Sequence, residues 1–254
     1  MIEPGNNQYR DSIVKITKKI SLSTVEILTI LVIITILTAL LLPPVQQAVN
    51  SGRREHFRDQ LKFVALALYQ YQEDRGCLPP AVVIDEQGNP IHSWRALLLP
   101  SLEQQSLFKD RHFDYRFDEP WNSPHNQQLA EQNPDLFRLE THLKDDTIRN
   151  SRLVAIIDDS TYWNESQECR LLSKGDDLKA QILLIEIPGF KGLWNEPSDI
   201  TLDELLKLTE TDSFGIYGAH ALYADGHVHC LSPEELNASN LLKQVRRPAV
   251  HHAD

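Results

Sequence analysis

Four side chains near the end of the chain have the chemistry of metal ligands. His220, Asp225, His227 and His229 lie within ten residues of one another, and imidazole and carboxylate groups are good ligands for zinc or iron. His227 and His229 are two residues apart, so on a strand they share one face. Asp225-Gly226 is a strong hairpin signal, and ligands on either side of a tight turn often point apart. We therefore favour surface positions of an edge hairpin, with a metal-dependent enzyme as the weaker alternative.

Motifs of other common enzyme classes are missing from the sequence. There is no G-x-S-x-G elbow for a serine nucleophile, no P-loop and no G-x-G-x-x-G fingerprint. Paired aspartates at 158–159 and 176–177 are most simply solvated turns, although oxygen-rich loops also suit calcium. The sequence therefore predicts neither catalysis nor a cofactor.

Composition and charge limit the class of protein. The 254 residues are 41% hydrophobic and 24% charged, which is typical of one large or two small globular domains. The net charge of -11 argues against nucleic-acid binding, because that function needs a basic face. Cys77, Cys169 and Cys230 lie far apart with no C-x-x-C motif. They are either three buried small residues or, if the head is exported, one disulfide and one free thiol. The sequence does not show which two cysteines would form the disulfide.

The most unusual stretch is apolar, with an acid in front and two prolines behind: SLSTVEILTILVIITILTALLLPPVQQ, residues 21–47. Ile27 to Leu42 as a helix would cover about 24 Å, short of the roughly 30 Å hydrocarbon core of a bilayer. Counting from Leu22 to Val45 closes the gap but includes Glu26. A cleaved secretory signal needs an A-x-A-like site, which is missing here. A plain membrane anchor would leave Glu26 without a role. A role is needed because a carboxylate inside a membrane is energetically costly.

Counted from Leu22, Glu26 is the fifth residue and Pro43 is the twenty-second. This spacing, behind a short basic leader, resembles the N-terminus of type IV pilins and type II secretion pseudopilins. The resemblance implies a peptidase cut between Ser21 and Leu22. It also implies that Glu26 pairs with the N-terminal amine of a neighbouring subunit, which makes a buried carboxylate tolerable. That family usually has Gly before the cut and Phe after it, so an uncut anchor is the alternative here.

Short motifs across the rest of the chain form a second pattern. They are Pro79-Pro80, His92-Ser93-Trp94-Arg95, Leu97 to Pro100, Leu102-Glu103-Gln104, Pro120-Trp121-Asn122-Ser123-Pro124 with Asn126, and Ala224-Asp225-Gly226-His227-Val228. Together they resemble a large family of unknown function, abundant in planctomycetes, whose members carry a pilin-like N-terminus. The resemblance extends over about residues 20–232, with this chain as a diverged member.

Periodicity predicts one long helix from about residue 22 to 75, kinked near Pro43-Pro44. Its second half has apolar residues at spacings of three and four, which indicates one buried stripe: Phe57, Leu61, Val64, Ala65, Leu68 and Tyr69. Gly76 and the prolines beyond it end the helix. Shorter helices are predicted after Ser93, with a break at Pro100, over residues 123–131 and over residues 202–208.

Strand signals dominate the second half of the chain. Four short segments are rich in β-forming residues: 152–158, 181–187, 220–225 and 227–231. Helices first and strands later are typical of α+β proteins. We predict a pilin-like α+β fold in which the amphipathic half of the long helix packs on an antiparallel sheet.

These observations predict five parts. They are a cytoplasmic leader (1–21), the transmembrane half of the long helix (22–45), its amphipathic half (46–75), an extracytoplasmic α+β head (76–242) and a flexible tail (243–254). The resemblance implies a single-pass protein of the cytoplasmic membrane that is a structural component of a pilus-like filament or secretion pseudopilus. Its expected partners are the membrane, further copies or other pilin-like subunits, and a prepilin peptidase. The alternative is an uncut anchored module that binds a ligand or cell-wall component.

Overall fold

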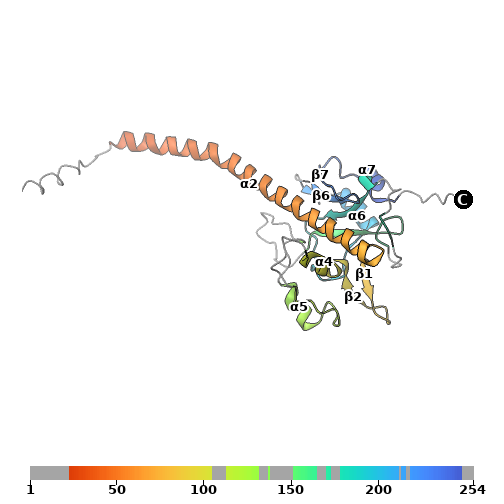
Figure 1. Cartoon of the computed structure of the whole chain (residues 1–254). Coiled ribbons are helices and arrows are strands. Elements are labelled where there is room, and N and C mark those ends of the chain that lie inside the picture. Colours follow the sequence, from red (N-terminus) through yellow and green to blue (C-terminus); the bar gives the residue numbers. More distant parts are fainter. Residues whose placement is uncertain are drawn as a thin grey trace, which may run out of the picture. The chain divides into compact units, whose positions relative to one another are not determined.

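The computed structural model describes residues 23–104, 113–131, 137, 151–164, 170–172, 178–211, 213–215 and 218–247. The chain divides into two units, residues 1–52 and residues 53–254. Figure 1 shows the order of the elements along the chain. The helices and strands are α2 (Thr24–Arg75), β1 (Val82–Ile84), β2 (Pro90–Ser93), α3 (Trp94–Leu97), α4 (Leu99–Glu103), α5 (Pro124–Ala130), β3 (Leu153–Ile157), the 3-10 turn Leu178–Ala180, β4 (Ile182–Glu186), β5 (Ile200–Thr201), α6 (Leu202–Thr209), β6 (Ala219–Tyr223), β7 (Val228–Leu231) and α7 (Ala238–Val245).

The predicted long helix is confirmed as α2, which runs without interruption from Thr24 to Arg75. It ends at Gly76, whose φ of 80° is left-handed and whose N–H donates to the carbonyl of Gln72 at 2.8 Å. Glycine adopts this conformation without the steric cost of a Cβ, as a helix C-terminus requires. The apolar stripe predicted for the second half of this helix is buried, and Phe57 and Leu61 are 1% and 0% exposed.

The main sheet has five strands in the order β5-β3-β4-β6-β7. The predicted α+β class is confirmed, but the prediction of an antiparallel sheet is wrong at one edge. Strand β5 pairs with β3 in parallel, through Ile156 with Ile200 and Ile157 with Thr201, and the other three pairs are antiparallel. A two-residue strand is too short to give an alternating pattern in the sequence, and its direction depends on the connection that precedes it.

The sheet of the second unit is covered on both faces. On one face, the stripe of α2 packs with α3 and α4 against strand residues such as Leu153, Leu184 and Leu222. On the other face, α6 and α7 pack against a second apolar cluster that contains Val154 and Ala221. Successive strand residues point to opposite faces, so one sheet supplies both clusters. The result is three layers: α2 with the short helices, the sheet, and α6 with α7.

The predicted Asp225-Gly226 hairpin is confirmed between β6 and β7. Gly226 has a φ of 85°, and a Cβ placed there would lie 3.3 Å from the ring of Tyr69 on α2. The Tyr69 hydroxyl donates to the carbonyl of Ala224 at 2.5 Å. The turn is therefore docked on α2, which gives the Ala-Asp-Gly sequence a packing role.

The shorter predicted helices are also present. Ser93, Ser123 and Thr201 are the N-caps of α3, α5 and α6. The break predicted at Pro100 lies two residues earlier, at Leu98, and Pro100 is in the first turn of α4. The β1–β2 hairpin was not predicted. Helix α7 includes residues 243–245 of the predicted tail, because Leu241 and Val245 are buried against the sheet. Residues 248–254 of that tail lie outside the described part of the chain.

Candidate functional site

The first turn of α2 places Glu26 at the start of the apolar half-helix. Glu26 Oε2 accepts the Ser23 N–H at 2.8 Å, and Ser23 Oγ accepts the Glu26 N–H at 3.3 Å. This reciprocal pair is a capping box, which satisfies two N–H groups that have no partner within the helix. This role was not predicted, although the signature Ser-x-x-Glu before an apolar run is present in the sequence. Glu26 therefore has a local structural role whatever else it binds.

The other side chains of this half-helix are suited to apolar surroundings. The hydroxyls of Thr29, Thr35 and Thr38 donate to carbonyls of their own helix, at 2.9, 2.8 and 2.8 Å. Such bonds leave no hydroxyl proton unsatisfied when water is absent. Every large apolar side chain between Val25 and Leu37 is 44–67% exposed, so this stretch presents apolar surface on every face among the described residues. Contiguous apolar surface of this kind is typical of a membrane or protein contact.

The remaining residues predicted for processing and assembly are only partly described. Ser21 and Leu22 lie outside the described residues, and Pro43 is described only as part of the α2 backbone. Among the parts of the chain that were described, no helix is long and apolar enough to cross a membrane. The predicted span of residues 22–45 extends past residue 38, where the described side chains of this half-helix end.

The structure does not bring the four metal-ligand candidates together. His220 is opposite Cys230 in the β6–β7 register and His229 is opposite Ala221, so the two histidines are on opposite faces of the sheet. His227 bonds to its near neighbour Asp225 in the turn. In the described part of the chain, no three His, Cys, Asp or Glu side chains form a group that could hold a metal ion.

His220 instead belongs to a contact between the sheet and α2. Its Nδ1 is 2.8 Å from Glu186 Oε2, and both side chains are at most 5% exposed. Phe57 of α2 lies edge-on to the imidazole, with ring centroids 5.2 Å apart. Beside it, the Arg54 guanidinium donates to the sulfur of Cys230. This cluster fixes the first packed turn of α2 on the head.

The structure describes two of the three cysteines that could form a disulfide. Cys77 and Cys230 are not bonded to each other, and Cys169 lies outside the described residues. Burial raises the pKa of the Cys230 thiol, and the Arg54 charge opposes that shift. A raised pKa disfavours the thiolate that a nucleophilic cysteine needs.

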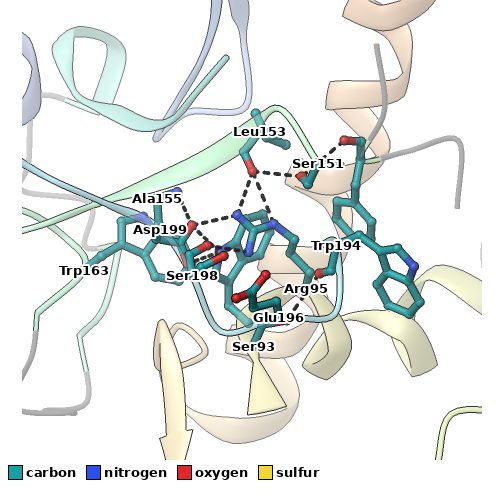
Figure 2. Close-up of polar contacts among 12 residues, drawn as sticks. Ser93, Arg95, Ser151, Leu153, Ala155, Trp163, Trp194, Glu196, Ser198 and Asp199 are labelled. Atoms are coloured by element: carbon teal, nitrogen blue, oxygen red, sulfur yellow. Dashed lines mark hydrogen bonds and ion pairs between the residues drawn. The ribbon is translucent and has the colours of Figure 1, made fainter. Parts of the chain in front are cut away.

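The second notable site is a buried ion pair in the head, formed by Arg95 and Asp199. Arg95 Nη2 lies 2.7 Å from Asp199 Oδ1, and the two side chains are 0% and 1% exposed. Figure 2 shows the guanidinium pointing at this carboxylate and at the carbonyl of Leu153, to which Nε and Nη2 donate at 3.2 and 2.8 Å. Its Nη1 donates to the carbonyl of Ser198 at 3.3 Å. All three guanidinium nitrogens are therefore paired.

Asp199 is equally well satisfied. Its Oδ1 accepts the Ala155 N–H at 2.8 Å, and its two oxygens lie 3.1 and 3.2 Å from the indole nitrogen of Trp94. Burial raises the pKa of Asp199 and lowers the pKa of Arg95, and for each group the partner's charge is the main influence in the opposite direction. Each nitrogen of Arg95 donates to the protein and neither charge reaches the surface, so this site joins α3, β3 and the segment before β5.

His92, next to this cluster, fixes the β2 strand to the segment before α5. Its Nε2 donates to the Phe117 carbonyl at 3.1 Å, so Nδ1 is the acceptor for the Tyr115 hydroxyl at 2.9 Å. The imidazole is 5% exposed, and burial lowers the pKa of His92, with the Phe117 carbonyl opposing this shift. The folded protein therefore favours neutral His92.

This lowered pKa predicts an acid-sensitive contribution to stability. A histidine with a lower pKa in the folded state binds fewer protons there than in the unfolded chain, so stability falls as pH drops below about 6.5. We expect His92→Gln to reduce the slope of unfolding free energy against pH by up to about one proton between about pH 7 and 5. Urea unfolding at several pH values measures this slope. Tyr115→Phe keeps the buried imidazole and removes only the donor to Nδ1, which favours the neutral form, so it should reduce the slope less than His92→Gln does. Equal slopes for His92→Gln and the wild type would contradict the assignment.

The fold and site thus define a protein with one long N-terminal helix, apolar in its first half, and an α+β head that contains a buried ion pair. Residues 46–167 match the family described as "Protein of unknown function (DUF1559)". The predicted similarity to a family of unknown function is confirmed to that extent. The match begins after the apolar half-helix and includes the Ser93-Trp94-Arg95 motif of the buried cluster. Neither the curated proteins nor the solved structures contain a match to the chain.

Proposed function

We propose that this protein is a pseudopilin-like structural component of the cell envelope, anchored in the cytoplasmic membrane with its head outside. In this proposal the leader lies in the cytoplasm, and the apolar half-helices of several subunits pack side by side in a pilus-like filament or secretion pseudopilus. The observation that carries it is the stretch Val25 to Leu37 of α2, whose large apolar side chains are all exposed and which has one carboxylate, Glu26, in the first turn of the helix. Burying such a surface against lipid or like helices is strongly favourable.

Glu26 is proposed to set the register between subunits by charge pairing with a neighbour's N-terminal amine. The capping box allows its charge to be separated from its local role. Gln at this position of a capping box keeps a side-chain acceptor for the Ser23 N–H but carries no charge. Ser23→Ala has the opposite effect, because it removes the hydroxyl and keeps the carboxylate.

The test compares these two variants as full-length chains in membranes of the producing cell. We expect Glu26→Gln to lower the fraction of cross-linked multimers at least about tenfold, since a charge-assisted contact in apolar surroundings is lost. Ser23→Ala should stay within about twofold of the wild type, because the loss of a cap weakens only the helix end. Both variants should remain in the membrane fraction. Normal multimers with Glu26→Gln would exclude the register role.

A second candidate is an uncut single-pass anchor whose head binds a ligand or cell-wall component. The capping box favours this candidate, because it gives Glu26 a partner within its own chain and removes the need for a neighbour's amine. Ser21, in place of the usual Gly before the cut, points the same way. The mass of the N-terminal peptide separates the two candidates: a chain that begins at Leu22 supports assembly, and one that begins at Met1 supports the anchor.

A further inference from the structure

Helix α2 contains an internal stretch with poor helix-forming residues, Asn50-Ser51-Gly52. Asn and Ser side chains compete with the helix for backbone hydrogen bonds, and Gly loses the most conformational freedom when it becomes helical. All three lie more than twenty residues from either end of the 52-residue helix. At such an internal position Ala favours the helix more than Gly does.

Neither backbone conformation nor a close neighbour requires a glycine at position 52. Gly52 is not among the glycines with a positive φ, so its backbone conformation is open to any residue. A Cβ placed on it would meet nothing within 4 Å, so no neighbour requires the missing side chain. Alanine would therefore fit and favour the helical form about fivefold. What the glycine provides is a weaker helix at this point.

The position of this stretch along α2 matters as much as its composition. Packing against the head begins directly after it, where Arg54 contacts Cys230 and Phe57 is 1% exposed against His220. From Phe57 onward tertiary contacts hold the helix, whatever its propensity. At Gly52, which is exposed, the helix depends on its own backbone bonds. These poor helix formers thus lie just outside the first packed turn.

We propose that Asn50-Ser51-Gly52 is a joint in α2, at which the helix opens locally while the packed turns from Phe57 onward stay closed. Opening there gives the apolar half-helix freedom of direction and leaves the core of the head intact. The proposal goes beyond the proposed function and does not depend on it, because a subunit in an assembly and a tethered head would both use such a joint.

Limited proteolysis of the full-length chain in detergent tests the joint. Trypsin cuts after Arg53 and Arg54, directly beyond the joint, and after Lys62, within the packed part of the same helix. Cleavage of a folded segment follows the population of its locally open form. We expect cleavage after Arg53 and Arg54 to be at least about tenfold faster than after Lys62. Mass spectrometry of the fragments over time gives both rates.

Helix-stabilising variants provide the decisive comparison. Gly52→Ala should slow cleavage after Arg53 and Arg54 about fivefold, and the triple alanine variant of residues 50–52 more than about tenfold. Leu66→Ala, at an exposed position of the packed part, should leave these rates unchanged. Equal cleavage at Lys62 and Arg54 in the wild type would overturn the proposal, as would fast cleavage that Gly52→Ala does not slow.

Discussion

Replacing Asp199 with Ala is expected to lower the free energy of unfolding by about 3–5 kcal/mol. The substitution leaves the Arg95 guanidinium fully buried without a counter-charge, and it also removes the acceptor of the Ala155 N–H. A buried charge without a partner is much less favourable than a buried pair, because it has lost its hydration and gained nothing in return. Urea unfolding followed by tryptophan fluorescence measures the change.

The destabilisation should come from the unpaired charge of Arg95 and not only from the loss of the Asp199 side chain. We therefore expect the double variant Arg95→Met with Asp199→Ala to be more stable, by about 1–3 kcal/mol, than the sum of the two single changes predicts. Glu119→Gln breaks the exposed ion pair with Arg116 and should cause no measurable change. A single Asp199→Ala variant as stable as the wild type would show that Arg95 is not held as a charge by this carboxylate.

The partner of Arg95 illustrates what the sequence does not reveal. Arg95 stands out in the sequence within His92-Ser93-Trp94-Arg95, but Asp199 is 104 residues away and follows no motif. Only the fold brings the two together, through a short segment that leads into β5. A pairing of this kind depends on tertiary topology, which local patterns do not encode.

Local signals were reliable where the physical cause is itself local. A hydroxyl that accepts an N–H three residues later stabilises the start of a helix through a contact within one turn, and Ser93 and Thr201 do so. The Asp225-Gly226 turn likewise depends on two residues and the left-handed φ of one of them. By contrast, β5 and the last helix, α7, are stabilised mainly by the sheet that they contact, and the sequence did not predict them.

The candidate sites differ for the same reason. The capping box of Ser23 and Glu26 spans four residues and is visible in the sequence, whereas the resemblance to pilins implies a partner for Glu26 in another subunit. The histidines near the end of the chain lie close together in sequence, but strand register separates His220 from His229. Proximity along a hairpin therefore does not establish a shared site until the register is known.

Gly218→Ala is expected to destabilise the head by about 3–5 kcal/mol. Gly218 has a φ of 69° and directly precedes β6. A Cβ placed there would lie 1.9 Å from the carbonyl oxygen of Leu231, which is backbone of the neighbouring strand. Relief of this clash requires β6 and β7 to separate where Ala219 pairs with Leu231. The change therefore combines backbone strain with the loss of strand pairing.

Gly189→Ala is the matched control, because it shares the backbone strain without the clash. Gly189 has a φ of 80°, and a Cβ there would meet nothing within 4 Å. Its substitution should cost only the penalty of a left-handed residue, about 1–2 kcal/mol. The difference between the two variants in urea unfolding thus isolates the contact between Gly218 and Leu231. Equal destabilisation by both substitutions would mean that the two strands can part at this end without loss, and that β7 contributes little to the stability of the sheet.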